Sequence, residues 1–558
     1  MVPKACLLFA APLLWAVDNR FTNLPDTNTH FNMPEYKTLA QWEARKKALR
    51  EQILFSAGLD PMPNFGPVKW QIFGRVENKD YSIEKVLVET RPGYYLGGNL
   101  YRPLGKAGKF PAVASPHGHW TYGRLEHTPS ASIPARSINL ARQGYVVFSY
   151  DMVGYNDTIQ TPHAFGSKQE QLWGFGPFGL QLWNSIRVVD FFSALPDVDA
   201  TRIGATGASG GGTQTFFLAA VDDRVKFAAP VNMLSAIMQG GSPCENAPGL
   251  RVGAFNIEYG AMMAPRPLLM VSATGDWTRN TLKEEYPAIK KIYELYDKSA
   301  YAEAVQIDAP HNYNQDSREA VYRFFAKHAL GDSDGAKYRE RGIRLEKLED
   351  MLALHNRTLP ARALDFKGVF VQWRGQVMQQ LRAIADPEEK RRLLRLALGT
   401  EWPKEVTSQS TSGKLVLSRP GVGDEVSAVW KEGKGKVTVV LGGGSAPAPS
   451  LALEVFRTRD HSKSHFIAFN RPDDALRVQD ILTALRWLEQ KGYQDIEISA
   501  SGDAAIWCRF AASVSSIKVK LKADVADFHG TDDEFTARFF VPGIQRAGGW
   551  QFALDLTR

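Results

Sequence analysis

A glycine-rich serine motif stands at residues 207–211, which read Gly-Ala-Ser-Gly-Gly. A nucleophilic serine must stand on a sharp turn between a strand and a helix, where tight backbone packing favours glycine two residues before and two after it. The apolar run 203–206 predicts the strand, and residues 210–220 predict the helix. The pattern therefore indicates Ser209 as a nucleophile that attacks a carbonyl group.

A serine hydroxyl becomes an effective nucleophile only when a base removes its proton and an acid orients that base. In this strand–turn–helix context the partners follow in the order serine, acid, histidine. Asp276 follows the predicted strand 267–273, and His311 follows the predicted strand 302–308. Because loops at the C-terminal ends of parallel strands gather at one edge of the sheet, we expect Ser209, Asp276 and His311 to form a catalytic triad.

Glu245 is an alternative to Asp276 as the acid. It lies in the loop after the predicted strand 225–231, where some serine hydrolases place the acid that orients the histidine. Asp308 is too close to His311 in the chain and falls inside a predicted strand. The sequence therefore favours Asp276 and keeps Glu245 open.

The transition state of acyl transfer carries an oxyanion that needs two preorganised N–H donors. The first is expected from the residue after the nucleophile, which is Gly210. The second is expected from a loop after an early strand, and residues 115–120 (Ser-Pro-His-Gly-His-Trp) have that position. Gly118 would allow a tight turn that directs the backbone N–H of His119 into the site.

No metal or cofactor is expected. His117 and His119 form a His-x-His pair, but no carboxylate or third histidine follows at a usual zinc spacing. Residues 441–445 (Leu-Gly-Gly-Gly-Ser) lack the lysine of a phosphate-binding loop. A disulfide framework or a cysteine metal site is also not predicted, because the chain has only three cysteines: Cys6, Cys244 and Cys508.

The elements that must position these residues alternate between short apolar strands and longer helices. This alternation predicts a mostly parallel sheet with helices on both faces, and with the serine motif it predicts an α/β-hydrolase fold. The expected strands are residues 81–90, 96–101, 110–115, 145–150, 203–206, 225–231, 267–273 and 302–308. The expected helices are residues 38–57, 131–143, 178–195, 210–220, 283–297 and 317–329.

The C-terminal part returns to the same alternation. In one alignment Gly502 takes the place of Ser209, and no histidine follows in the required order. The aligned pairs are residues 496–505 with 203–212 and residues 541–546 with 247–252. We therefore expect a truncated, degenerate second α/β-hydrolase-like domain without catalytic residues, containing strands at 437–441 and 464–469 and a helix at 474–490.

At 558 residues, 44% of them apolar, the chain is long enough for two or three folded units. Lys4 followed by the apolar stretch 5–16 predicts a signal peptide and hence a secreted or periplasmic protein. The expected organisation is a signal peptide at 1–16, an N-terminal helix and strand extension at 17–84, a catalytic domain at 85–331, a helical connector at 332–405 and the degenerate domain at 406–558.

The charge distribution argues against nucleic acid as a partner. The net charge of +7 is spread over the chain, with no run of five or six like charges. After the leader, no segment reaches the eighteen apolar residues of a membrane span. A small-molecule or carbohydrate ester is the expected partner, and the sequence leaves the oligomeric state open.

Several motifs resemble the acetyl xylan esterase and dienelactone hydrolase-like branch of the α/β-hydrolase superfamily, over residues 85–331. The motifs are His-Gly-His at 117–119, the serine motif at 207–211, Pro-His-Asn at 310–312, Gly-Gly-Asn-Leu-Tyr-Arg-Pro at 97–103 and Leu-Pro-Asp-Val-Asp at 195–199. The resemblance implies a serine esterase that acts on a carbohydrate ester through an acyl-serine intermediate. It also implies Ser209, Asp276 and His311 as the triad, with His119 and Gly210 as oxyanion donors.

The chain departs from acetyl xylan esterases at two positions. Those enzymes usually have tyrosine where this chain has His119 and glutamine where it has Gly210. A prolyl-oligopeptidase-like peptidase shares the triad order, but such enzymes are gated by a long β-propeller and only about a hundred residues precede the predicted catalytic domain here. A non-catalytic binding protein on a hydrolase scaffold is the third alternative.

Overall fold

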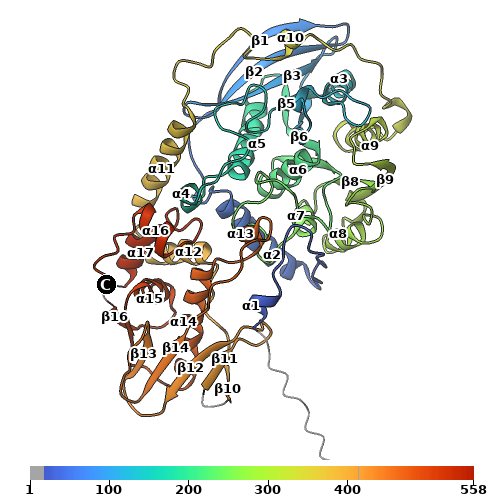
Figure 1. Cartoon of the computed structure of the whole chain (residues 1–558). Helices are drawn as coiled ribbons and strands as arrows, with labels where there is room; N and C mark the ends of the chain where they lie inside the picture. The colour runs from blue at the N-terminus through green and yellow to red at the C-terminus, as the bar shows by residue number, and fades with distance from the viewer. Residues whose placement is uncertain (1–17, 412–413, 524, 558) are drawn as a thin grey trace, which may run out of the picture.

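The computed structural model describes residues 18–411, 414–523 and 525–557, so the predicted leader at 1–16 lies outside the described residues. Two β-sheets organise the chain, at the top and bottom of Figure 1. We call the part that contains the first sheet, up to residue 331, the N-terminal unit, and the part from residue 406 the C-terminal unit. Within the described ranges, no helix is long and apolar enough to cross a membrane.

The first sheet has nine strands in the order β1-β2-β3-β5-β4-β6-β7-β8-β9. Strands β1, β2, β3 and β5 pair antiparallel in turn, and every pair from β5 to β9 is parallel. The strands are β1 Lys69–Glu77, β2 Tyr81–Arg91, β3 Tyr94–Pro103, β4 Phe110–Ala114, β5 Val146–Tyr150, β6 Val198–Ala208, β7 Val225–Val231, β8 Leu268–Gly275 and β9 Ala302–Pro310. All eight predicted strands of this unit are present, and β1 is an additional edge strand that the sequence analysis missed.

Helices cover both faces of this sheet, as predicted. Along β4 and β5, Val113 and Val147 pack with α3 and α9, whereas Ala114 and Phe148 join the core formed with α5 and α6. This alternation follows from the two-residue period of a strand. The helices of the N-terminal unit are α1 Asn19–Thr22, α2 Leu39–Ser56, α3 Ile133–Gln143, α4 Lys168–Leu172, α5 Pro177–Ala194, α6 Gly210–Val221, α7 Asn256–Ala261, α8 Glu285–Glu294 and α9 Gln315–Phe325.

The connector is less helical than expected. It contains α10 (Leu348–Met351), α11 (Phe366–Arg382) and α12 (Pro387–Leu398), but residues 338–346 form no regular helix. Two charged residues of that segment form ion pairs with α9: Arg339 with Glu319, and Glu340 with Arg318.

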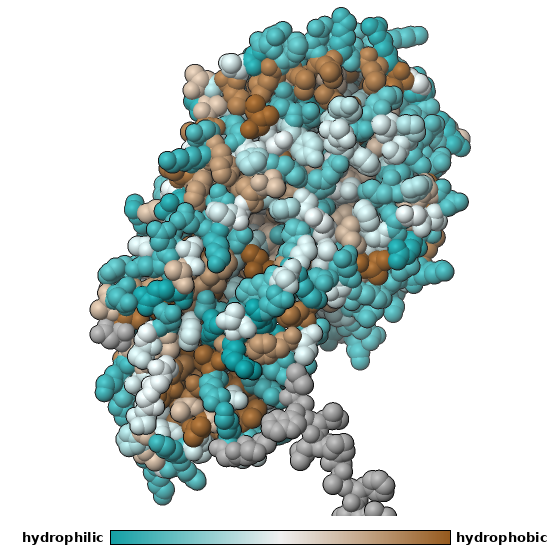
Figure 2. Space-filling view, viewed as in Figure 1, coloured by the Kyte–Doolittle hydropathy of each residue, from teal (hydrophilic) through white to brown (hydrophobic). Residues whose placement is uncertain are grey.

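On the face drawn in Figure 2, hydrophilic residues predominate and hydrophobic residues gather near the top, the region of β1 and α10.

The second sheet has seven strands in the order β10-β11-β12-β14-β13-β15-β16. Its first three pairs are antiparallel and the rest are parallel, so order and direction match the first seven strands of the N-terminal sheet position by position. The strands are β10 Thr407–Thr411, β11 Lys414–Ser418, β12 Val426–Lys431, β13 Val437–Leu441, β14 Ser450–Glu454, β15 Ile496–Ala500 and β16 Lys520–Ala523. The helices are α13 Phe466–Phe469, α14 Asp473–Gln490, α15 Asp503–Val514, α16 Asp532–Arg538 and α17 Gly549–Leu556.

The predicted strand at 464–469 is wrong, because the segment forms the short helix α13. Phe466, Ala468 and Phe469 are buried, and Phe469 packs on Phe255 of the N-terminal unit. A continuous apolar run of this length does not distinguish a buried strand from a short buried helix. The helix after β14 instead makes a contact between the two units.

Candidate active site

Ser209 stands at the turn between β6, which ends at Ala208, and α6, which begins at Gly210. Its backbone has φ 59° and ψ −126°, a strained conformation for a residue with a side chain. The neighbouring backbone is packed too tightly for larger residues: a Cβ atom at Gly207 or Gly211 would lie 2.6 or 2.7 Å from the carbonyl oxygen of Pro116. The glycine spacing thus has a steric cause, and the turn projects Ser209 from the edge of the sheet.

Asp276 and His311 are hydrogen-bonded to each other, with Oδ2 of Asp276 2.7 Å from Nδ1 of His311. The other carboxylate oxygen accepts from the backbone N–H and the hydroxyl of Thr278, at 2.7 and 2.5 Å. This buried carboxylate fixes the proton of His311 on Nδ1, which leaves Nε2 as the basic nitrogen. Among the described residues, Nε2 is buried and has no hydrogen-bond partner.

Two aromatic rings flank His311 and connect its loop to the serine turn. The Trp277 ring lies 4.4 Å from the imidazole centroid, and the Trp120 ring stacks at 6.0 Å on it. Gly118 lies between Trp120 and the serine, since a Cβ atom there would be 3.2 Å from Nε1 of Trp120 and 3.0 Å from Cβ of Ser209. The structure therefore brings Ser209, Asp276 and His311 to the same edge of the sheet.

Two further residues hold this edge together, and sequence reasoning missed both. The hydroxyl of Tyr313 lies 2.6 Å from Oγ1 of Thr206 on β6, which anchors the histidine loop to the strand that carries the serine. Asn232, at the end of β7, donates from Nδ2 to the carbonyl of Asn312 and accepts from the indole of Trp277 at its own carbonyl. The partners of these side chains lie 107 and 80 residues away in the chain, so no local motif marks them.

Glu245 does not contact His311. Its Oε1 accepts from the hydroxyl of Thr213 at 2.9 Å, and its Oε2 accepts from the backbone N–H groups of Gly241 and Ser242 at 3.0 and 3.2 Å. Both oxygens are therefore occupied by α6 and by the loop that contains Glu245. In this arrangement Glu245 stabilises a loop, and Asp276 is the carboxylate that bonds His311.

The two expected oxyanion donors lie against each other. Gly210 is the first residue of α6, so its backbone N–H has no acceptor within the helix and lies at the positive end of the helix dipole. A Cβ atom at Gly210 would lie only 2.7 Å from Cε1 of His119. The two departures from the esterase pattern are therefore linked, because the His119 ring fills the space that a side chain at position 210 would need.

Gly118 is required for a steric reason and not for a left-handed turn. A Cβ atom there would approach the carbonyl oxygen of Ala208 to 2.6 Å.

The preceding residue, His117, is fully buried. Its Nδ1 donates to the carbonyl of Gly118 at 2.7 Å, and its Nε2 accepts from the N–H of Met152 at 3.0 Å. Burial lowers the pKa of His117 to about 3, so the ring is neutral and structural. Both nitrogens are occupied, which excludes a His117–His119 metal pair in this conformation.

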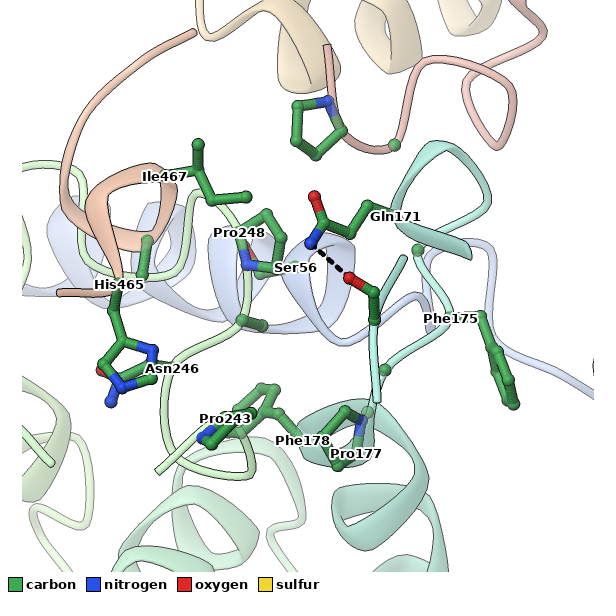
Figure 3. Close-up of a pocket in the computed structure, with 18 of the residues that line it drawn as sticks. Ser56, Gln171, Phe175, Pro177, Phe178, Pro243, Asn246, Pro248, His465 and Ile467 are labelled. Atoms are coloured by element: carbon green, nitrogen blue, oxygen red, sulfur yellow. Dashed lines mark hydrogen bonds between the residues drawn. The ribbon is translucent and has the colours of Figure 1, made fainter. Parts of the chain in front are cut away.

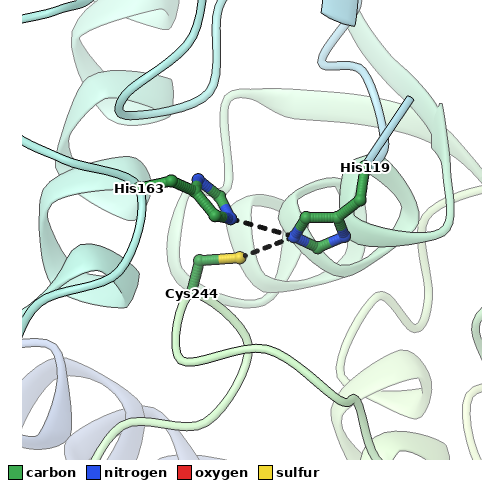
Figure 4. Close-up of side chains that lie close together, drawn as sticks. All are labelled: His119, His163 and Cys244. Carbon is green, nitrogen blue, oxygen red and sulfur yellow. Dashed lines mark hydrogen bonds between the residues drawn. The ribbon is translucent and has the colours of Figure 1, made fainter. Parts of the chain in front are cut away.

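His119 instead meets two residues from other loops (Figure 4). Its Nε2 lies 3.1 Å from Nε2 of His163 and 3.2 Å from Sγ of Cys244. Sequence analysis missed this cluster because 44 and 125 residues separate His119 from its two neighbours. It is the one place in the described part of the chain where three such potential metal-ligand side chains converge.

A cavity of about 260 Å³ lies between the two units (Figure 3). Its walls are mostly apolar, and Ser209 is not among the residues that line it. Residues from both units contribute, including Phe178, Pro243, Pro248, His465, Ile467 and Pro542. The cavity is therefore separate from the serine turn, although the loop that carries Cys244 forms part of its wall.

Comparison with known proteins supports the fold. The chain is similar to the solved structure of Methylesterase BT1017, with 29% identity and a TM-score of 0.51 over 62% of this chain and 78% of that one. It is 28% identical over 192 residues to "Putative hydrolase YtaP" of Bacillus subtilis (strain 168), a match over 32% of this chain and 62% of that protein, less than two thirds of its length. A Glucuronoyl Esterase from Solibacter usitatus matches at 16% identity and a TM-score of 0.41, over 55% of this chain and 97% of that one. No protein-family model matches the chain. The sheet order and the serine turn are those of the α/β-hydrolase type, and the similarity to Methylesterase BT1017 agrees with this fold.

Proposed function

We propose that this protein is a serine esterase that hydrolyses a carboxylic ester through an acyl-serine intermediate. The observation that carries the proposal is the hydrogen bond between Asp276 and His311, which leaves Nε2 of the histidine as an unpartnered base at the edge where Ser209 stands. The similarity to Methylesterase BT1017 supports ester hydrolysis as the reaction.

In the proposed mechanism His311 accepts the proton of Ser209 at Nε2 while the serine oxygen attacks the ester carbonyl carbon. The backbone N–H groups of Gly210 and His119 stabilise the oxyanion that forms. His311 then donates the proton to the leaving alkoxide, which departs as an alcohol. Water, activated by the same nitrogen, hydrolyses the acyl-serine and releases a carboxylic acid. The Asp276 carboxylate stabilises the imidazolium in both steps without accepting its proton.

We further propose a carbohydrate as the carrier of the ester. Trp120 and Trp277 are only partly buried and flank His311, so their rings can provide apolar surface for a sugar. The ester is either an acetyl ester of a sugar hydroxyl or a methyl ester of a sugar carboxylate. The first choice follows the resemblance to acetyl xylan esterases, and the second follows the similarity to a methylesterase.

A substrate panel tests this proposal. The full chain and Ser209→Ala are assayed on an aryl acetate, an acetylated xylo-oligosaccharide, a methyl-esterified uronic acid and an aminoacyl arylamide. We expect hydrolysis of at least one sugar ester by the wild type and none by the variant. Hydrolysis of the arylamide alone would favour the peptidase, and no turnover of any substrate would favour a binding protein.

We also propose that the C-terminal unit is a degenerate copy of the N-terminal unit. Support comes from the shared strand order and from reciprocal hydrogen bonds between the units. Gly249 donates its backbone N–H to the carbonyl of Ile467, and Gly543 donates its own to the carbonyl of Gln171, both at 2.8 Å. In the first bond, the Pro-Gly element of the N-terminal unit binds the short helix α13 of the C-terminal unit. In the second, the Pro-Gly element of the C-terminal unit binds the short helix α4 of the N-terminal unit. Each short helix precedes a long helix of its own unit, α14 or α5.

The same relationship extends to the next residues, which supports an approximate two-fold arrangement of the units. The backbone N–H of Arg251 donates to Ala468, and that of Gln545 donates to Leu172. We propose that the C-terminal unit contributes packing and cavity walls without catalysis.

We also propose that residues 1–16 are a leader removed on export. Mass spectrometry of the N-terminus of the secreted protein tests this proposal.

A further inference from the structure

The cluster of His119, His163 and Cys244 has the dimensions of a metal site (Figure 4). The two Nε2 atoms are 3.1 Å apart, Nε2 of His119 is 3.2 Å from Sγ, and all three atoms lie within 4.8 Å of one another. Tetrahedral Zn²⁺, with Zn–N of about 2.0–2.1 Å and Zn–S of about 2.3 Å, places such atoms roughly 3.3–3.6 Å apart. The two contacts of His119, at 3.1 and 3.2 Å, differ from these values by only a few tenths of an ångström.

The ring of His163 is already oriented for a ligand. Its Nδ1 lies 2.7 Å from the carbonyl oxygen of Val153. A carbonyl only accepts, so Nδ1 must carry the proton, and in the neutral ring Nε2 presents a lone pair to His119 and Cys244. A backbone carbonyl behind the second nitrogen is the usual support of a metal-binding histidine. The ring of Tyr155 packs edge-on against the same imidazole at 5.1 Å.

The three side chains are joined to one another only through Nε2 of His119, while the Cys244 thiol also donates to Oγ of Ser242 at 3.3 Å. Nε2 of His119 carries at most one proton in the neutral ring, yet it faces both the lone pair of His163 and the sulfur of Cys244. One N–H directed at both acceptors cannot be well aligned with each. A cation accepts lone pairs from all three atoms, and the buried carboxylate of Glu245, next to Cys244 in the chain, adds favourable negative charge.

We propose that His119, His163 and Cys244 bind Zn²⁺ or a chemically similar borderline-soft divalent cation. A thiolate with two imidazoles suits such ions and not Mg²⁺ or Ca²⁺. Binding displaces the thiol proton of Cys244 to solvent and involves no oxidation or reduction. Since His119 is exposed, the fourth position of a tetrahedral ion remains open to water or to an oxygen of a bound molecule.

The site adjoins the serine turn but does not depend on the proposed esterase reaction. The His119 ring packs against Gly210, so a bound ion would hold the ring, and with it the loop that provides one proposed oxyanion donor. The ligands come from three loops, after β4, after β5 and after β7. An ion would therefore add a direct link among the three loops, the first two of which are already joined by the hydrogen bond from Met152 to His117.

Cobalt substitution tests the site without an activity assay. The full chain is treated with a chelator, dialysed and titrated with CoCl₂. We expect one Co²⁺ per chain with visible d–d bands of a tetrahedral ion and a near-ultraviolet thiolate-to-cobalt charge-transfer band, and we expect Zn²⁺ to displace it. Cys244→Ser should lose the charge-transfer band, and His163→Ala should weaken Co²⁺ binding by at least about 100-fold.

Matched controls locate the site and separate it from the esterase proposal. Cys508→Ser removes the other described cysteine, and His461→Gln removes an exposed histidine of the C-terminal unit; both should keep the bands. Ser209→Ala should also keep them, so a failed esterase proposal leaves this result intact. Absence of the bands in the folded wild type, or their persistence at full strength in both Cys244→Ser and His163→Ala, would overturn the metal site.

Discussion

Ser209 and Gly502 share one backbone conformation, with φ 59° and ψ −126° at the serine and φ 58° and ψ −143° at the glycine. Each stands between the sixth strand of its sheet and the helix that follows. At Gly502 the conformation has little steric cost, whereas Ser209 must hold it with a side chain. The strained turn of the N-terminal unit therefore retains what the C-terminal turn lacks, a hydroxyl at the edge of the sheet.

Ser209→Ala should abolish hydrolysis of an aryl acetate. Members of a catalytic triad act as a unit, and loss of the nucleophile in a serine protease lowers kcat by on the order of a million-fold. Folding should survive because the alanine removes only the hydroxyl. The measurement is steady-state kinetics alongside thermal unfolding of both proteins. Residual activity above a few per cent in the folded variant would place the nucleophile elsewhere.

Asp276→Asn should lower kcat by about four orders of magnitude, by analogy with the aspartate of the serine proteases. The asparagine would no longer hold the proton of His311 on Nδ1, so Nε2 would lose its role as base. Glu245→Gln is the matched comparison, and it should cost far less because Glu245 bonds Thr213 and its own loop. The reverse ranking in kcat would identify Glu245 as the acid.

The parts of the fold that could be predicted are those where burial dictates composition. Parallel strands covered on both faces read as continuous apolar runs, such as Val225–Val231, so they were recognisable. The edge strand Thr407–Thr411 (Thr-Ser-Gln-Ser-Thr) has no apolar pattern and was missed. The proposed triad follows a known order along one chain. The position of His163 near Cys244 instead depends on three loops whose paths no local pattern encodes.

Gly210→Ala should lower esterase activity strongly, although the substitution adds only one methyl group. The added methyl group would meet Cε1 of His119 and Cε of Met152, each at 2.7 Å, so the His119 ring must move. Misplacing one oxyanion donor costs up to about 10²–10³ in kcat. Gly375→Ala, on α11 with open space around the new methyl group, is the control and should leave kcat unchanged. Equal activity in the two variants would show that the His119 ring does not constrain the oxyanion donors.

His117 should make the fold sensitive to acid. Its pKa falls from 6.5 to about 3 on folding, so between these values the unfolded chain binds more protons than the folded protein. This contribution to stability is complete above pH 6.5 and is lost, at about 1.4 kcal/mol per pH unit, as the pH falls toward 3. His117→Asn, whose amide can still donate to Gly118, should show a shallower slope of unfolding free energy between pH 6.5 and 4.5.

A second measurement addresses His117 in the wild-type protein. Because burial lowers its pKa to about 3, its ring resonances should not titrate down to pH 4.5 in an NMR series. A His117 signal with a midpoint near 6.5 would contradict the burial argument whatever the variant does.

The two Pro-Gly elements that join the units should respond differently to the same substitution. Gly249 and Gly543 both have positive φ, 74° and 78°, so alanine at either position costs about 1–2 kcal/mol in backbone strain. At Gly543 the new methyl group would also lie 2.9 Å from the ring of Phe55 on α2, whereas at Gly249 its nearest neighbour is Oγ of Ser56 at 3.6 Å. Gly543→Ala should therefore lower the unfolding midpoint more than Gly249→Ala.

Both variants should leave activity on an aryl acetate unchanged in the folded protein, because neither glycine is near Ser209 in the chain or bonds to its loops. Equal midpoints would mean that the contact with Phe55 does not couple the units, and a large loss of activity in folded Gly543→Ala would contradict a purely structural role for the C-terminal unit.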